Sequence, residues 1–261
     1  MRNLNPILNL LRGAMLGALL SAPLAAPAFA AAEEIELPDV AFSFKGPFGS
    51  IDKAAAQRGY QVYKEVCSNC HSMKQVYFRT LEGIGLSAAE IKTLAASYDV
   101  PTIGDDGQPA ERKGLPSDKF KVPYANEKAA RAAQNGALPP DQSVIVKARE
   151  GGADYIYALM TGYTEPPAGM KMADGMNYNK YFPGHQIAMA APLSEGRVEY
   201  TDGTKATLPQ MAKDVATFLE FVAEPEMEQR KRMGIKIVLF LAMMTGLTYV
   251  VKRQIWSDVD H

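Results

Sequence analysis

The two cysteines of this chain lie three positions apart, and a histidine directly follows the second one. The stretch "VCSNCHSM", residues 66–73, contains Cys67, Cys70 and His71, and the 261 residues hold no other cysteine. One disulfide between such close neighbours would constrain the chain very little. A structural zinc site needs four ligands, whereas this stretch offers three. A redox dithiol of the thioredoxin type needs a βαβ setting and has no use for the histidine.

The remaining interpretation is C-x-x-C-H, the attachment signature of c-type haem. In that chemistry both thiols add to the haem vinyl groups, and the imidazole of the next residue binds the iron from one side. The stretch therefore predicts one covalently bound haem c per chain, held by Cys67, Cys70 and His71.

The second axial ligand of such an iron is not fixed by the motif. An electron carrier fills this position with methionine or a second histidine, whereas an oxygen or substrate binder leaves it open. Methionines in the two apolar segments and beside the motif are discounted. The candidates that we retain lie in one long loop: Met170, Met172, Met176, Met189 and His185. The residue types alone do not choose among them.

The first 30 residues have the composition of a secretory signal peptide. They contain Arg2 and Arg12 and no acidic residue, followed by an apolar run from Ala14 to about Leu24. The triplet "AFA", residues 28–30, offers the small-x-small pattern of a cleavage site. We therefore expect residues 1–30 to be a signal peptide, and export agrees with the site of c-type haem attachment outside the bacterial cytoplasm.

A second apolar segment lies near the C-terminus. The stretch "MGIKIVLFLAMMTGLTYVV", residues 233–251, contains a single charge, Lys236, and basic clusters flank it on both sides. At about 1.5 Å per residue, a helix of this length crosses a hydrocarbon core of about 30 Å. We expect a transmembrane anchor over residues 230–252.

These two segments divide the chain into a signal peptide, an exported haem domain over residues 31–229, the anchor and a cytoplasmic tail over residues 253–261. The whole chain has 28 basic and 29 acidic residues. The domain over residues 31–229 retains 20 of the basic and 27 of the acidic residues, a net charge of about −7. This charge argues against nucleic acid as a partner and favours a basic protein.

Helix signals dominate the exported domain. Capping residues predict helices that begin at Ser50, at Ser87 with Glu90, and at Thr207 with Gln210. Further helices are expected in "NEKAARAAQNG", "DQSVIVKAREGG" and "DYIYALMTGY". Residues 99–125 and 164–206 are rich in Gly, Pro and Asp and predict loops, with a hairpin around "EYTDGTKA". The expected fold is mainly α, with long loops that enclose a flat cofactor.

Several longer stretches resemble one family. They are "RGYQVYKEVCSNCHSM", "NGALPPDQSVIVKAREGGADYIYALMTGY", "YFPGHQIAMAAPL" and "DGTKATLPQMAKDVATFLEFVAEPEMEQRKRMG", followed by one apolar span and Trp256. In this order they resemble the cytochrome c1 family, in an alphaproteobacterial or mitochondrial-like form. The resemblance covers nearly the whole chain after residue 30. It implies a haem domain like that of class I cytochromes c plus one C-terminal transmembrane helix.

The resemblance also implies roles for individual residues. The axial methionine of the family falls on Met189, and the arginine and tyrosine near the haem propionates fall on Arg149 and Tyr155. The chain departs from the family at His185, where many relatives carry Gln or Gly. It has no cysteine beyond the haem pair, so the additional disulfide of some bacterial relatives cannot form.

The function implied by the resemblance is electron transfer, with no catalytic residue in the chain itself. The family's haem takes single electrons from the Rieske iron–sulfur protein and passes them to a soluble, basic cytochrome c. It does so in a complex with cytochrome b, expected to be dimeric, at the bacterial inner membrane with the haem domain in the periplasm. Two alternatives are another membrane-anchored monohaem cytochrome and a haem-based sensor with an open iron site.

Overall fold

The structure is a computed structural model that describes residues 35–258, so the predicted signal peptide, residues 1–30, lies outside the described residues. Its helices are α2 (Lys53–Glu65), α3 (Ala88–Ala96), α4 (Glu127–Ala133), α5 (Gly152–Thr161), α6 (Leu208–Ala223) and α7 (Met227–Ile255). Three short 3₁₀ segments are η1 (Cys67–Asn69), η2 (Phe78–Ile84) and η3 (Ile145–Ala148). The prediction of a mainly α fold is confirmed.

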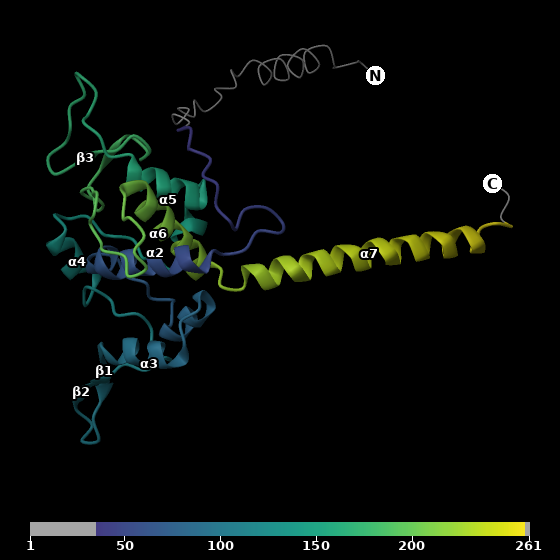
Figure 1. The fold of residues 1–261 in the computed structure, drawn as a ribbon, viewed down its shortest axis with the longest axis horizontal. Coiled ribbons are helices and arrows are strands. Elements are labelled where there is room, and N and C mark those ends of the chain that lie inside the picture. Colours follow the sequence, from purple (N-terminus) through teal and green to yellow (C-terminus); the bar gives the residue numbers. More distant parts are fainter. Residues whose placement is uncertain (1–34, 259–261) are drawn as a thin grey trace, which may run out of the picture. The chain divides into compact units, whose positions relative to one another are not determined.

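Helix α2 lies side by side with α6, and α5 packs against α6 as well (Figure 1). The predicted apolar stripe of α6 is buried: Met211, Val215, Phe218 and Val222 are all less than a tenth exposed. The crossing with α2 is close because Gly59 has no side chain, and a Cβ there would lie 2.0 Å from the carbonyl oxygen of Asp214. The pair α2 and α6 therefore forms the frame from which the C-x-x-C-H turn extends.

Two of the predicted helix starts are confirmed and one is wrong. Ser87 and Glu90 form a reciprocal capping box at α3, and the Thr207 hydroxyl accepts a hydrogen bond from the backbone of Gln210 at α6. Helix α2 begins after Asp52 instead of Ser50. The Asp52 carboxylate caps it by accepting from the backbone N–H groups of Ala54 and Ala55, at 3.0 and 3.1 Å.

The strands do not lie where the sequence predicted a hairpin. Strands β1 (Asp99–Ile103) and β2 (Pro109–Lys113) form an antiparallel pair inside the first predicted loop. Strands β3 (Asn177–Tyr178) and β4 (Gln186–Ile187) form a short pair inside the second. The hairpin predicted around residues 199–206 is wrong, because this segment has turns and no strand.

Helix α7 is 29 residues long and, among the described residues, is the one helix that is long and apolar enough to cross a membrane. Its apolar stretch has no buried residue in the structure. The helix extends beyond both ends of the predicted anchor, residues 230–252. The N-terminal part of α7 is bonded to the predicted haem domain of residues 31–229, here called the head. The Glu228 carboxylate accepts from the backbone N–H of Ile51, and the Lys231 ammonium donates to the carbonyl oxygens of Phe44 and Gly49.

Candidate functional site

The two cysteines and the histidine share one tight turn that follows α2. The backbone N–H groups of Cys70 and His71 both donate to the carbonyl oxygen of Cys67, at 3.1 and 2.9 Å. This 3₁₀ geometry reverses the chain directly after the helix. Both thiols and the imidazole are therefore carried by a single element whose direction is set by α2.

The imidazole of His71 is held by a backbone carbonyl. Its Nδ1 lies 2.8 Å from the carbonyl oxygen of Pro140, which can only accept, so Nδ1 carries the proton in this bond. Burial lowers the pKa of His71, and this effect outweighs the bond to Pro140 and the nearby charge of Asp141. The ring is therefore neutral at neutral pH and presents Nε2 as a free lone pair, the form that binds a metal ion.

Asp141 fastens the segment after His71 to the segment that holds Pro140. Its carboxylate accepts from the Ser72 hydroxyl at 2.8 Å, from the Lys74 backbone at 2.8 Å and from the Ser143 backbone at 3.0 Å. The backbone N–H of Gln142 in turn donates to the carbonyl oxygen of Ser72 at 2.8 Å. These bonds fix the distance between His71 and Pro140, and so the direction of the ring.

The two thiols are free among the described residues and differ in their surroundings. Cys67 is half-buried and packs against the apolar core, and burial raises the pKa of its thiol to about 12. The sulfur of Cys70 lies 3.5 Å from the side-chain amide nitrogen of Gln134. The Cys67 sulfur therefore lies against the core, and the Cys70 sulfur lies at a more polar edge. This arrangement suits a large flat group with one edge in the core and one edge near polar side chains.

Met189 lies in the segment that follows β4 and is half-buried against the same apolar core that Cys67 contacts. Its carbonyl oxygen accepts a hydrogen bond from the Tyr163 hydroxyl at 3.0 Å. Tyr163 comes directly after α5, so this bond ties the Met189 segment to the end of that helix. The Met189 thioether therefore belongs to a segment whose backbone is held in place by a hydrogen bond.

His185 lies in the turn between β3 and β4 with a backbone φ of +61°. Its backbone N–H donates to the carbonyl oxygen of Phe182 at 2.7 Å, and its ring stacks on Tyr178 with centroids 5.6 Å apart. Its Nδ1 lies 3.3 Å from the carbonyl oxygen of Asn179. These contacts give the histidine a role inside the turn.

Arg149 and Tyr155 lie next to each other, although six positions separate them. Arg149 ends η3 with an extended backbone, and its guanidinium donates to the carbonyl oxygen of Ala148 at 2.8 Å. Burial raises the pKa of the Tyr155 hydroxyl, and the charge of Arg149 partly opposes this rise. Burial raises the pKa of Tyr163 and the nearby Tyr155 adds to this rise, so Tyr155 lies close to the tyrosine that bonds the Met189 carbonyl.

This donor set fits a covalently bound haem. Two free thiols at C-x-x-C spacing can form the two covalent links, and a neutral imidazole with a fixed tautomer can bind the iron. A half-buried thioether is a soft ligand for the opposite side. Met170, Met172 and Met176 lie earlier in the same loop, where the described contacts are those of turns. The roles of these residues toward a haem stay predictions.

Three residues that were not predicted from the sequence hold the predicted site residues or their neighbours in place through hydrogen bonds. Pro140, Asp141 and Tyr163 were given no role, although "ALPPD" and "TGY" lie in the stretches that carry the family resemblance. A proline pair followed by aspartate is a signal for a turn in which the carboxylate binds nearby backbone groups. The partner of that turn, the segment after His71, could not be identified from spacing.

Comparison with known proteins gives the family. The model of the Cytochrome C1 family matches residues 42–259. The chain belongs to this family. The match begins at Phe42 and includes the whole of α7, so this long apolar helix lies within the region that the family model covers.

The cytochrome C1 relatives come from mitochondria and bacteria. "Cytochrome c1, heme protein, mitochondrial" of Saccharomyces cerevisiae is 50% identical over 235 residues, 89% of this chain and 76% of the relative. "Cytochrome b-c1 complex catalytic subunit, mitochondrial" of Candida albicans is 46% identical over 237 residues, 90% of this chain and 82% of the relative. "Cytochrome b/c1" of Bradyrhizobium diazoefficiens is 44% identical over 244 residues, 85% of this chain and 36% of that longer protein.

Proposed function

We propose that this chain is a membrane-anchored c-type cytochrome that carries electrons within a cytochrome bc1 complex. The observation that carries the proposal is the C-x-x-C-H turn, in which both thiols are free and His71 is held through Nδ1 by Pro140 at 2.8 Å. The names of the relatives support both a haem and a place in a b-c1 complex. A haem c, one per chain, supplies an iron that accepts and releases one electron.

Each named side chain has a part that follows from its setting. Cys67 and Cys70 would hold the group covalently just after α2, and His71, with its proton held on Nδ1 by Pro140, would offer Nε2 to the iron. The soft thioether of Met189 would be the second iron ligand and would favour the reduced metal. Arg149 and Tyr155 offer a positive charge and a hydroxyl for the carboxylates at the cofactor edge. No residue acts as an acid, base or nucleophile, so the chain is not an enzyme by itself.

The proposed partners follow from the family and from the charge of the head. The donor is the Rieske iron–sulfur protein, the neighbour in the membrane is cytochrome b, and the acceptor is a soluble basic cytochrome c. The complex is a dimer in the bacterial inner membrane, with residues 31–229 in the periplasm, residues 230–252 as the anchor and residues 253–261 in the cytoplasm. The exposed apolar face of α7 supports the anchor, and the head's charge of about −7 supports a basic acceptor.

Spectra of the purified chain together with its copurifying subunits test this proposal. A haem c with His/Met ligation gives a sharp reduced α band and a weak thioether–iron charge-transfer band in the oxidised protein. We expect both bands, together with cytochrome b and a Rieske protein in the same detergent complex. A haem that binds carbon monoxide at neutral pH would instead indicate a sensor. Copurification with other redox subunits would indicate a different membrane cytochrome.

A further inference from the structure

A pocket of about 150 Å³ opens beside α2 and next to the C-x-x-C-H turn, whose Ser68 is one of its lining residues. It is lined by ten described residues, and Cys67, Cys70, His71 and Met189 are not among them. A cavity of about 150 Å³ is the size that holds one benzene ring. The volume therefore suits a single six-membered ring with a small substituent.

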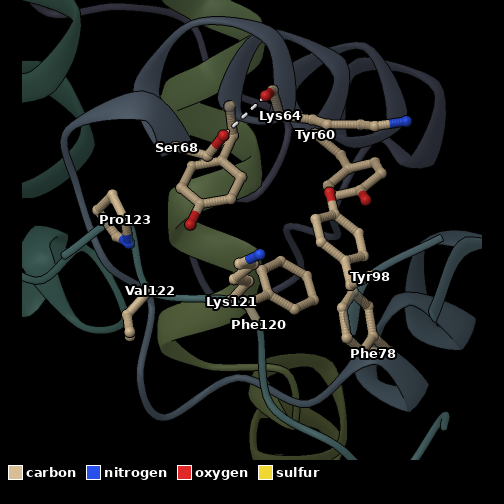
Figure 2. Close-up of a pocket in the computed structure, with 10 residues that line it drawn as sticks. Tyr60, Lys64, Ser68, Phe78, Tyr98, Phe120, Lys121, Val122 and Pro123 are labelled. Atoms are coloured by element: carbon tan, nitrogen blue, oxygen red, sulfur yellow. Dashed lines mark hydrogen bonds between the residues drawn. The ribbon is translucent and has the colours of Figure 1, made fainter. Parts of the chain in front are cut away.

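Aromatic side chains form most of the wall. Figure 2 shows Tyr60, Tyr98 and Phe78 along one side of the pocket and Phe120 beside them. The ring centroid of Phe78 lies 4.9 Å from that of Phe120 and 5.3 Å from that of Tyr98. Aromatic rings attract another ring in offset or edge-to-face geometry. The wall therefore favours a flat aromatic occupant over an aliphatic one of the same size.

One polar atom in the wall has no partner. The Tyr63 hydroxyl is buried and makes no hydrogen bond within the part of the chain that the structure describes, and the residue is 3% exposed. An unsatisfied buried hydroxyl costs about 1–3 kcal/mol. Tyr63 lines the pocket, so an oxygen atom of an occupant could supply the missing bond.

The rim of the pocket is positive. Lys64 and Lys121 both line it, and no acidic side chain is among the ten described lining residues. Lys121 also lowers the pKa of Asp99, but Lys113 has the larger effect and holds that carboxylate at 2.8 Å. Lys64 forms no ion pair within residues 35–258. The two ammonium groups thus favour an anion over a neutral ring.

From the volume, the aromatic wall, the unpaired hydroxyl and the two lysines, we propose that this pocket binds a small aromatic carboxylate. The ring lies among Tyr60, Phe78 and Phe120, and the carboxylate accepts from the Tyr63 hydroxyl and faces Lys64 and Lys121. Tyr63 precedes Cys67 by one helical turn on α2, so an occupant would lie within one turn of the haem attachment site. Nothing in the proposed electron transfer requires this ligand.

The test uses the full-length holoprotein in detergent with benzoate as the probe, followed by titration calorimetry and saturation-transfer NMR. We expect saturable binding with a dissociation constant on the order of 1 mM, as suits a ligand of about ten non-hydrogen atoms. Cyclohexanecarboxylate has the same charge without the flat ring, and benzyl alcohol has the ring without the charge. Both should bind at least about fivefold more weakly.

Variants separate this site from nonspecific binding. Tyr63→Phe keeps the ring and removes the hydroxyl. It should raise the dissociation constant of benzoate by about tenfold, because a hydrogen bond to a charged group is lost. Lys64→Gln with Lys121→Gln should weaken it by about threefold, as exposed charges contribute little. Val122→Trp should block the pocket. Lys92→Gln, on the exposed face of α3, is the matched control and should leave binding unchanged.

Two results would overturn the proposal. One is the absence of saturable benzoate binding to the holoprotein. The other is equal binding by the wild type, by the double lysine variant and by Val122→Trp, which would place the probe elsewhere. The lysine and valine positions are on the surface, so these variants keep the test decisive even if Tyr63→Phe fails to fold. A normal haem spectrum in each variant confirms that the site of the cofactor is intact.

Discussion

The guanidinium of Arg58 in α2 donates two hydrogen bonds, 2.9 and 3.1 Å long, to the carboxylate of Asp214 in α6. The Asp214 side chain is fully buried, and Gln210 donates to it as well at 3.0 Å. The same guanidinium reaches the exposed Asp202 at 3.0 Å. This pair lies beside Gly59, where α2 closely approaches the backbone of Asp214 in α6, so it stabilises the frame from which the C-x-x-C-H turn extends.

Removing the buried carboxylate should destabilise the head strongly. Asp214→Ala leaves Arg58 without its main partner, and breaking such a buried pair costs about 3–5 kcal/mol. The matched control is Asp202→Ala, which removes an exposed partner of the same arginine and should cost at most about 1 kcal/mol. Thermal unfolding of the full-length protein in detergent, followed by circular dichroism, measures both. Equal losses would show that burial of Asp214 is not what matters.

Local signals allowed the helices to be predicted, because caps and apolar stripes act over a few residues. The capping box of Ser87 and Glu90 is an example, and it is confirmed. The hairpin was misplaced because a D-G turn signal occurs three times, at residues 106–107, 174–175 and 202–203, and the signal alone does not show which turn joins two strands. At residues 199–206, Tyr200 is buried in the core and Asp202 pairs with Arg58, so this segment has no strand partner. At residues 99–113 the turn residue Gly107 has φ of +75°, and two exposed strands pair around it.

The residues that would bind the cofactor could be predicted from the sequence, but the hydrogen-bond partners that position them could not. C-x-x-C-H is contiguous, so Cys67, Cys70 and His71 could be named from the sequence. The contact between His71 and Pro140 joins positions 69 residues apart, and no periodicity reports such a pair. The bond from Tyr163 to the Met189 carbonyl spans 26 positions and was missed for the same reason.

Loss of the cysteines should prevent normal attachment of the cofactor. In Cys67→Ser or Cys70→Ser we expect at most one covalent link and little assembled protein, because the proposed haem would form part of the apolar core of this domain. Haem-stained denaturing gels measure the covalent bond directly. The double variant Cys67→Ser, Cys70→Ser should give no stain at all, and normal staining there would refute the assignment of the motif.

Replacing Met189 by leucine should open the sixth position while the haem stays attached. The reduction potential should fall, since the soft thioether that favours ferrous iron is lost, and the reduced protein should bind carbon monoxide. His185→Ala is the comparison, because its ring stacks on Tyr178 and its backbone holds the turn. If the charge-transfer band survives Met189→Leu and disappears in His185→Ala, then histidine and not methionine is the ligand.

A chain that ends at Gln229 should be exported, soluble and loaded with haem, because the exposed apolar part of α7 lies beyond it. This chain keeps the bond from Ile51 to Glu228 and loses the two bonds that Lys231 makes to Phe44 and Gly49. A chain that ends at Arg232 keeps all of them and should unfold at a higher temperature. Retention of either chain in washed membranes, in cells without the partner subunits, would contradict a single C-terminal anchor.

Electron transfer to a basic soluble cytochrome c should slow as salt rises. The head carries about −7, and the Debye length shortens from about 30 Å at 0.01 M to about 8 Å at 0.15 M ionic strength. Complementary charge acts mainly on the rate of encounter, so we expect the second-order rate constant to fall by about tenfold over this range. Stopped-flow mixing of the reduced protein with the acceptor measures it.

The position of the acidic residues should matter as well as their number. Asp105 and Asp106 lie at the tip of the hairpin of β1 and β2, and the base of this hairpin is fixed by two bonds between Arg112 and Asp118 of 2.6 and 2.7 Å. Asp105→Asn with Asp106→Asn should flatten the salt dependence without a change in reduction potential. Glu36→Gln with Asp39→Asn removes the same charge elsewhere, and Asp39 is already paired with Lys45. Equal flattening by both pairs would show that net charge alone attracts the acceptor. No dependence on salt in the wild type would show that docking rests on apolar contacts around the haem edge.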